Sequence, residues 1–384
     1  MVVKRLRTIM ALAVSVLFLA ACGNLSNSTS SSGGATTSKS GTTLTGQTSN
    51  GDYEGVIKNG HYLTSKSRGV TNTEDSGNVY NVKSFESGMQ NLSKKIYPPQ
   101  SYVFQEGQYL DSSTVEDWLG RESSSNPTGL NPKKNKSTSP TSRNPIYIQA
   151  LEEQDYMKQS GKSLKLSGMT IGIAVNSVDY YKKTQYGATY QTNISQAKGE
   201  AYAKDAAKTV LKRLRAKKAL KDVPITIALY RQSSNDSLVG GTFFAYTQSK
   251  GNQTTINNWS TVNQKNYVLP VENGESGPKS ADKTAFSNFK SQVTSFFPNL
   301  SGVTAQVHYE NGSLTGMHVN VTTQFYSQTE ITSFTQYLAQ AAQKYLPAKV
   351  PADITVTSAT GETQSYLSRS ENGSKFQAHV FDSY

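Results

Sequence analysis

Four segments of the chain have apolar residues spaced three and four positions apart, which is typical of amphipathic helices. They predict helices over residues 85–96, 195–218 and 286–296, and a fourth that begins near residue 327. Pro98 and Pro298 end the first and third helices, because proline has no N–H to continue the helical ladder. Ser327 and Glu330 have the spacing of a capping box, which marks the start of the fourth.

Short apolar runs predict strands between and after these helices. Residues 223–228 and 350–356 each follow a predicted helix and each begin with Val-Pro. Residues 169–175 and 241–246 are further predicted strands, since they are rich in β-branched and aromatic side chains bounded by turn residues.

A hairpin is predicted where residues 303–309 alternate apolar and polar side chains before Asn311-Gly312. A two-residue loop would set the apolar side chains of one strand against polar ones of the other. A three-residue loop over 311–313 instead places all of them on one face, and burial favours that register. The predicted pairs are Val303 with Val321, Ala305 with Val319 and Val307 with Met317.

The succession of helix, strands, helix and Val-Pro strand occurs twice along the chain. It predicts an α+β fold made by tandem duplication of an antiparallel sheet with helices on one face. The alternative is a single composite sheet.

The chain is expected to begin with a signal peptide at 1–21 and a lipidated Ser/Thr/Gly-rich tether at 22–51 that is too polar to fold. A first repeat at 52–250 follows, with a polar insertion near 122–145. A connecting segment at 251–274 then leads to a second repeat at 275–384.

The N-terminus has the pattern of a lipoprotein signal peptide. A basic start precedes an apolar run at 9–19 that is too short to span a bilayer. Leu19, Ala20 and Ala21 form the predicted recognition site of a signal peptidase, and Cys22 supplies the thiol for lipid attachment. The alternative is an ordinary signal peptide, but a lone cysteine in an exported chain then has no role.

The predicted mature chain is basic. Three of the 39 Lys and Arg lie in the signal peptide, which leaves 36 against 27 Asp and Glu, a formal charge of +9. Such a surface suits anionic lipid head groups or wall polymers, or serves solubility alone. Eight of the basic residues lie between 204 and 221, either to complement a helix dipole or to contact phosphates. Nucleic acid is not expected outside the membrane.

Candidate catalytic chemistry is sparse. His308, His318 and Glu310 share the polar face of the predicted hairpin and are weak candidates for metal ligands, because zinc motifs normally have tighter spacing. No nucleophile motif is present, and no catalytic residue or cofactor is predicted. The run at 152–155, with Glu152, Glu153 and Asp155, is predicted to lie on the solvent face of a helix.

Tyrosines cluster in one polar segment after a predicted strand. Tyr180, Tyr181, Tyr186 and Tyr190 are candidates for contact with a glycan or peptide, since exposed tyrosines on a loop offer both an apolar ring and a hydroxyl. The alternative is that these rings pack over the edge of the domain.

Several long strings resemble the CamS family of sex pheromone precursor lipoproteins of Gram-positive bacteria. They are Tyr-Glu-Gly-Val-Ile-Lys-Asn-Gly at 53–60, Lys-Ser-Phe-Glu-Ser-Gly at 83–88, Phe-Gln-Glu-Gly-Gln-Tyr-Leu at 104–110, Asn-Ser-Val-Asp-Tyr-Tyr at 176–181, Tyr-Gly-Ala-Thr-Tyr-Gln-Thr at 186–192 and Asn-Asp-Ser-Leu-Val-Gly-Gly-Thr at 235–242. The resemblance covers nearly the whole mature chain.

The resemblance implies a function for each part of the precursor. The discarded signal peptide would give a hydrophobic pheromone composed of Ser15, Val16, Leu17, Phe18, Leu19, Ala20 and Ala21. The mature part would be a two-repeat lipoprotein on the outer face of the cytoplasmic membrane. We expect that part to be a non-enzymatic binding or envelope-associated module whose partner is an anionic wall polymer or a peptide. The alternative is a metal-dependent or other cell-wall hydrolase.

Overall fold

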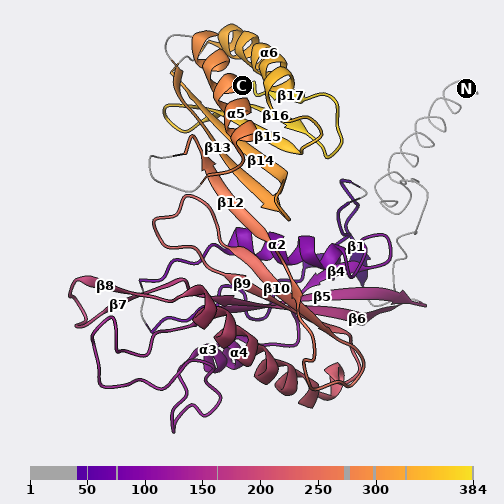
Figure 1. Cartoon of the computed structure of the whole chain (residues 1–384). Coiled ribbons are helices and arrows are strands. Elements are labelled where there is room, and N and C mark those ends of the chain that lie inside the picture. The colour runs from indigo at the N-terminus through magenta and orange to yellow at the C-terminus, as the bar shows by residue number, and fades with distance from the viewer. Residues whose placement is uncertain are drawn as a thin grey trace, which may run out of the picture.

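The computed structural model describes residues 41–49, 51–74, 77–161, 163–271, 277–296, 300–324 and 327–382. The fold is α+β, as predicted, with two six-stranded sheets that form the cores of two units, one above the other in Figure 1. The predicted signal peptide, pheromone segment and Cys22 lie outside the described residues.

The first unit is built on the sheet with the order β11-β10-β9-β6-β5-β4. Its strands are β4 (Val103–Glu106), β5 (Ile148–Ser160), β6 (Ser163–Val175), β9 (Ile225–Arg231), β10 (Thr242–Ser249) and β11 (Ser260–Thr261). Strands β6 and β9 are parallel, and the other neighbours are antiparallel. The parallel pair arises because α4 (Gln196–Ala216) carries the chain back across the sheet before β9 begins.

The second unit repeats this topology. Its sheet has the order β12-β13-β14-β15-β16-β17, with one parallel pair, β14 and β15, joined by α6 (Gln328–Tyr345). The strands are β12 (Gln264–Leu269), β13 (Leu300–Glu310), β14 (Ser313–Thr323), β15 (Ala352–Ser358), β16 (Thr363–Arg369) and β17 (Gln377–Val380). Helix α5 (Ser280–Phe296) joins β12 to β13, as α3 (Ser112–Leu119) joins β4 to β5.

The shared topology of the two sheets supports the predicted tandem duplication, with three changes of detail. Each sheet is mixed rather than antiparallel, because a helical crossover returns the chain in the same direction. The helix predicted at 85–96 is α2 (Val82–Lys94), and it precedes β4, so the counterpart of α5 is α3 rather than α2. The segment 251–274, expected to connect the repeats, contributes β11 to the first sheet and β12 to the second.

Part of the predicted tether, residues 41–49 and 51, lies within the described structure and contributes a strand. Thr42–Leu44 forms β1, which pairs with β2 (Val56–Lys58), and β2 pairs with β3 (His61–Tyr62). Leu44 packs against the core of the first unit. The prediction of disorder is wrong for this part of the tether, because one apolar side chain and a partner strand suffice to fix it. A further hairpin consists of β7 (Val178–Lys182) and β8 (Thr189–Asn193).

The β13–β14 hairpin has the three predicted pairs, Val303 with Val321, Ala305 with Val319 and Val307 with Met317. Its loop differs from the prediction. Residues 310 and 313 pair directly, so the turn is Asn311-Gly312, both at positive φ. The extra residue sits further along, in a β-bulge beside His308. Burial of the apolar face thus sets the strand register. The bulge takes up the one-residue offset between this register and the two-residue Asn-Gly turn.

The first sheet is buried on both faces. Helices α3 and α4 cover one face, and α2 covers the other, on the side of the second unit (Figure 1). Phe85 and Met89 of α2 lie over small residues of the sheet, among them Ala150 and Ala174. Within the described residues, α5 and α6 pack on one face of the second sheet, and its other face carries polar side chains.

Gly172 of β6 allows the close approach of α2 to the sheet. A Cβ at this position would lie 2.3 Å from the sulfur of Met89 and 2.5 Å from Cζ of Phe85. Gly172→Ala should therefore lower the free energy of unfolding by about 1–3 kcal/mol through overpacking, measured by urea denaturation. Gly302→Ala in β13 is the matched control, since its Cβ would meet nothing within 4 Å. Equal stability of the two variants would contradict this account of the packing.

Candidate functional site

A cavity of about 470 Å³ lies beside α2, between this helix, strands β4 and β5, and the segment after β3. Carboxylates dominate its charged lining: Glu86 comes from α2, Glu106 from the end of β4 and Glu152 from β5. Arg68 lines the same cavity, together with aromatic rings that include Phe104.

Glu152 is the most deeply placed of the three carboxylates. Its Oε1 accepts a hydrogen bond of 2.6 Å from the hydroxyl of Tyr80. Burial raises the pKa of Glu152 to about 7, the negative charges of Glu86 and Glu106 raise it further, and the bond from Tyr80 opposes the shift. At neutral pH this carboxyl is poised between its two protonation states.

Glu106 and Glu86 differ in the partners of their carboxylates. Glu106 forms an ion pair with Arg68 and also accepts a 2.6 Å hydrogen bond from the backbone N–H of Ser65. The carboxylate of Glu86 accepts no hydrogen bond and forms no ion pair with a described residue. Burial raises the pKa of Glu86, and the charge of Glu106 adds to the shift. Three mutually repelling carboxylates thus share the lining with two cations, Arg68, which is paired with Glu106, and Lys83.

The prediction of a solvent-exposed helix at 152–155 is wrong, because these residues lie on β5 in the middle of a sheet covered on both faces. Glu153 points away from α2 and accepts hydrogen bonds from the backbone N–H groups of Gln108, Tyr109 and Leu110. Burial and then the charge of Glu153 raise the pKa of Asp155 well above its usual range. Through its three hydrogen bonds to backbone N–H groups, Glu153 holds the loop after β4 in place.

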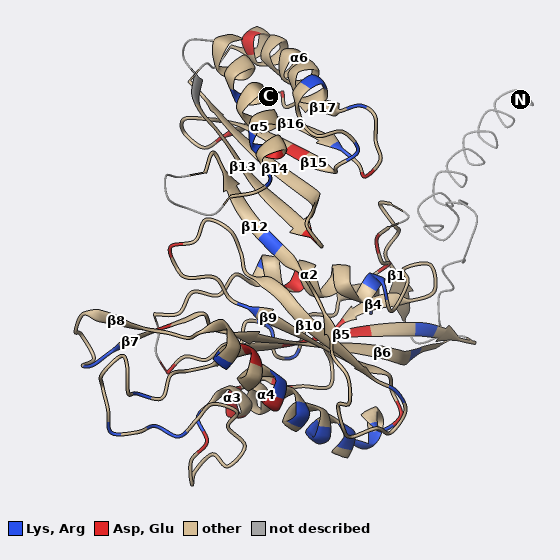
Figure 2. Ribbon diagram, in the orientation of Figure 1, with Lys and Arg blue, Asp and Glu red and all other residues tan. Residues whose placement is uncertain are grey.

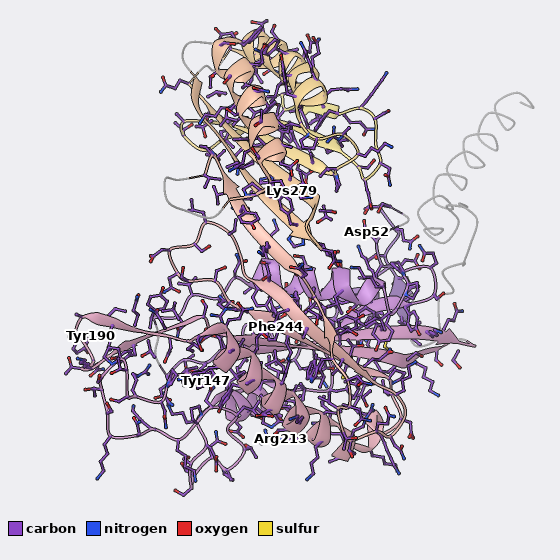
Figure 3. All side chains as sticks on the ribbon, in the orientation of Figure 1. Asp52, Tyr147, Tyr190, Arg213, Phe244 and Lys279 are labelled. Atoms are coloured by element: carbon purple, nitrogen blue, oxygen red, sulfur yellow. The ribbon has the colours of Figure 1, made fainter. Side chains whose placement is uncertain are left out.

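The candidate tyrosines lie on the β7–β8 hairpin, away from the cavity. Tyr180 and Tyr181 are buried, whereas Tyr186 is 92% exposed at the turn and Tyr190 is partly exposed at the outer edge of the first unit (Figure 3). The hydroxyl of Tyr181 donates to the carbonyl of residue 138, and the guanidinium of Arg143 lies 3.8 Å from its ring centroid. The structure does not gather the four rings into one surface, and the two buried ones serve packing.

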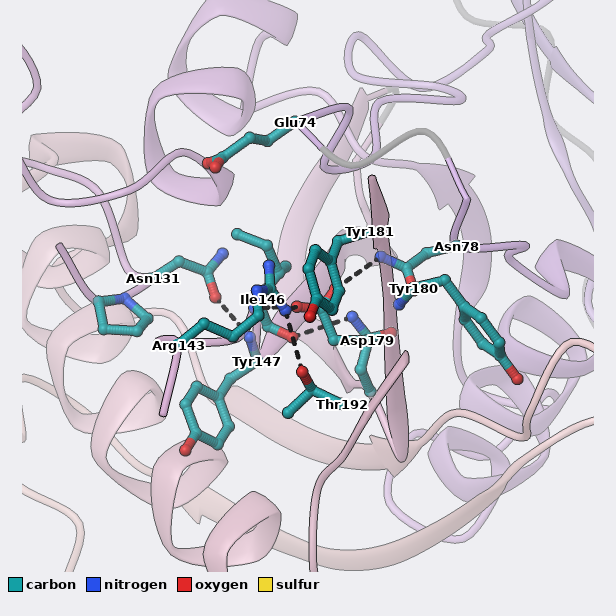
Figure 4. A network of polar contacts seen from close by, with 12 residues as sticks. Glu74, Asn78, Asn131, Arg143, Ile146, Tyr147, Asp179, Tyr180, Tyr181 and Thr192 are labelled. Atoms are coloured by element: carbon teal, nitrogen blue, oxygen red, sulfur yellow. Dashed lines mark hydrogen bonds and ion pairs between the residues drawn. The ribbon is translucent and has the colours of Figure 1, made fainter. Parts of the chain in front are cut away.

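A buried polar network holds this hairpin to the polar insertion (Figure 4). Asp179, which is fully buried, forms an ion pair with Arg143 and accepts hydrogen bonds from the N–H of Ile146 and the amide of Asn78. Residues 122–145 lack helices and longer strands, as expected of an insertion. Asn131 nevertheless anchors them, since its side chain bonds backbone groups of Leu119 and β5.

The candidate metal ligands are not assembled into a metal site. His308 Nδ1 lies 2.5 Å from Asn266 Oδ1, His318 bonds Asn320, and Glu310 forms an ion pair with Lys95 of the first unit. In the part of the chain that the structure describes, no group of three His, Cys, Asp or Glu side chains could hold a metal ion.

The basic run at 204–221 is divided between structural and exposed residues. Arg215 is buried and donates to the carbonyls of Leu220 and Val223, each at 2.6 Å, and to Ser249 of β10. Lys208 and Lys212 are exposed on α4. Helix α4 lies on the side of the first unit away from the second, and Figure 2 shows several Lys and Arg along it. Over the described residues, no helix has the length and apolar character needed to cross a bilayer.

Sequence inspection did not single out the cavity residues Arg68, Glu86 and Glu106. One available signal was that Glu86 and Glu106 fall within two of the strings that carry the family resemblance, at 83–88 and 104–110. Their convergence with Glu152 depends on α2 and on the pairing of β4 with β5, which no local pattern predicts.

Comparison with known proteins gives consistent matches. The family model described as "CamS sex pheromone cAM373 precursor" matches residues 62–375. A sex pheromone precursor from Lactobacillus salivarius subsp. salivarius is 52% identical, with a TM-score of 0.85, over 90% of this chain and 100% of that one. The C-terminal domain of the staph-cAM373 precursor from Staphylococcus aureus is 28% identical, with a TM-score of 0.68, over 80% of this chain and 98% of that one. No curated protein matches the chain.

The raised pKa of Glu152 predicts a pH-dependent stability. Because the folded state holds this proton up to about pH 7, its contribution is complete below pH 4.5 and is lost as pH rises through 7. Glu152→Gln cannot ionise, so the wild type should lose about 3 kcal/mol more unfolding free energy than the variant between pH 4.5 and 8. Urea denaturation across this range measures the difference. The exposed Glu116→Gln is the control, and parallel pH profiles for Glu152→Gln and wild type would contradict the prediction.

Proposed function

The chain belongs to the CamS family of sex pheromone precursors, and on that premise we propose that it yields two products. The first is a hydrophobic peptide, residues 15–21, released from the signal peptide. The second is an extracellular body anchored by lipid on Cys22 to the outer face of the cytoplasmic membrane. The sequence around Cys22 supports this division, since an apolar segment ends there in two small residues before a thiol.

Peptide release depends on Cys22 in this proposal. Cells that express the chain should release a peptide ending at Ala21, detected by mass spectrometry of the medium, and should retain the body in the membrane fraction. Cys22→Ser should abolish release of the peptide and leave the body without lipid, because the serine hydroxyl cannot form the thioether. Ser26→Ala in the adjacent polar segment should leave both unchanged. A wild-type body that carries no lipid on Cys22, as measured by mass spectrometry, would refute lipid anchoring.

We further propose that the body is a binding module for a ligand with a free ammonium group, such as a peptide amino terminus. The cavity carries this proposal, because Glu86 lies in it without an ion pair to a described residue, beside Glu106 and Glu152, while Arg68 is paired with Glu106 and Lys83 is exposed on α2. An ammonium group beside Glu86 would relieve the repulsion among the three carboxylates and supply hydrogen-bond donors. An anionic wall polymer fits the basic exterior instead, where Lys208 and Lys212 are exposed.

A hydrolase is the second candidate, favoured by one observation. A carboxyl with a pKa of about 7 is matched to general acid–base catalysis at neutral pH, and Glu152 has further carboxylates beside it. A metal-dependent hydrolase is not supported by the candidate ligands, because His308, His318 and Glu310 each have other partners. Binding of an amine-bearing ligand without its chemical change would separate a binding module from a hydrolase.

Ligand binding can be tested with the dipeptide Ser-Val and its N-acetylated form. The free amine should bind and the acetylated form should not, as measured by isothermal titration calorimetry. Glu86→Gln should weaken binding of the dipeptide at least about tenfold, equivalent to about 1.4 kcal/mol, by removing the unpaired carboxylate. The exposed Glu116→Gln, which makes the same charge change on α3, should have no effect. Equal binding of the free and acetylated dipeptides would exclude an ammonium site.

A further inference from the structure

A second cavity, of about 510 Å³, lies on the opposite flank of α2. It is enclosed by α2, by the loop that contains Gly240, and by strands β12 to β15 of the second unit. Lys83 and Ser87 line both cavities. The two cavities are therefore neighbours, one on each side of these two residues.

The helical period explains this arrangement. Val82, Glu86 and Gln90 are four residues apart and face the first cavity. Asn81 and Ser84 face the second. Lys83 and Ser87 lie between these two stripes and are exposed, opposite the buried stripe that packs on the sheet. We call this exposed stripe, Lys83 and Ser87, the crest of α2.

His308 presents a hydrogen-bond acceptor to the second cavity. The amide nitrogen of Asn266 donates to the carbonyls of Gly240 and Gly241, at 3.0 and 3.2 Å, which turns its oxygen towards His308. An amide oxygen can only accept, so His308 Nδ1 carries the proton. Burial lowers the pKa of His308, and the neutral ring then has an acceptor at Nε2.

Other groups in the second cavity are also available for hydrogen bonding. The side-chain nitrogen of Gln306 donates to the carbonyl of Leu238 at 2.6 Å, which leaves its amide oxygen as an acceptor. Lys83 forms no ion pair with a described residue, and its ammonium is a donor. Neutral acceptors beside a donor match the alternating N–H and C=O groups of a peptide backbone.

We propose that the two cavities form one groove that binds an extended oligopeptide across the crest of α2, with its amino terminus in the first cavity. The ammonium contact rests on the function proposed above, whereas the path across the crest does not. A helix with side chains is about 10 Å wide, and an extended chain advances about 3.3 Å per residue. About three residues would span the crest, and two more at each end give a ligand of about seven.

The length dependence of binding tests the groove. The heptapeptide Ser-Val-Leu-Phe-Leu-Ala-Ala, which matches residues 15–21, should bind at least about tenfold more tightly than the dipeptide Ser-Val in calorimetric titrations. Ser87→Trp places a bulky ring on the crest and should bring heptapeptide affinity down to that of the dipeptide, with both affinities measured on this variant. Asn91→Trp, one turn further along the same exposed stripe and outside both cavities, should change neither affinity. Gln306→Ala should weaken only the heptapeptide.

The outcomes separate this proposal from the preceding one. Equal affinities for the two peptides, or a heptapeptide affinity unaffected by Ser87→Trp, would overturn the groove while leaving the ammonium site intact. An N-acetylated heptapeptide that binds as well as the free one and is blocked by Ser87→Trp would support the groove and overturn the ammonium site. Absence of binding by both free peptides would overturn both.

Discussion

The packing of α2 on the first sheet is the contact on which the rest of the molecule depends. It is possible because the sheet presents small residues under the helix, Ala150, Ala174 and above all Gly172. With α3 and α4 on the opposite face, the central strands lose both solvent faces. Any carboxyl on the covered part of β5, residues 148–157, must then find a partner inside the protein or keep a proton. The unusual state of Glu152 thus follows from the position of one helix.

The same helix explains why the two repeats differ chemically. Both units have the succession of strands and helices expected of a duplication, but α2 has no counterpart in the second unit among the described residues. The second sheet therefore keeps a polar face, with His308 and His318 on it, where the first sheet has a buried core. Both cavities border α2, so the candidate sites lie where the symmetry of the duplication is broken.

The amino-acid sequence predicts those parts of the fold in which burial and polarity coincide. Helices α2, α4, α5 and α6 each have an apolar stripe, and the β13–β14 pairing follows from an alternating pattern. The prediction for β5 failed because polarity was taken as a sign of exposure. Glu152 is stabilised by Tyr80, 72 residues earlier in the chain, and Glu153 by three backbone N–H groups of a distant loop. Such compensation is tertiary and leaves no periodic signal.

The chain as a whole is positively charged, whereas carboxylates outnumber cations in the lining of the first cavity. The formal net charge of the chain is +12, and exposed lysines such as Lys208 and Lys212 are screened by salt over about 8 Å at physiological ionic strength. The carboxylates of the cavity act in a partly desolvated space, where screening is weaker and selection for a cation is stronger. A body held beside an anionic surface by its proposed lipid anchor could therefore contact that surface through its exterior. Its cavity would remain selective for a cationic ligand, because the lysines of the exterior and the carboxylates of the cavity act at different places and over different ranges.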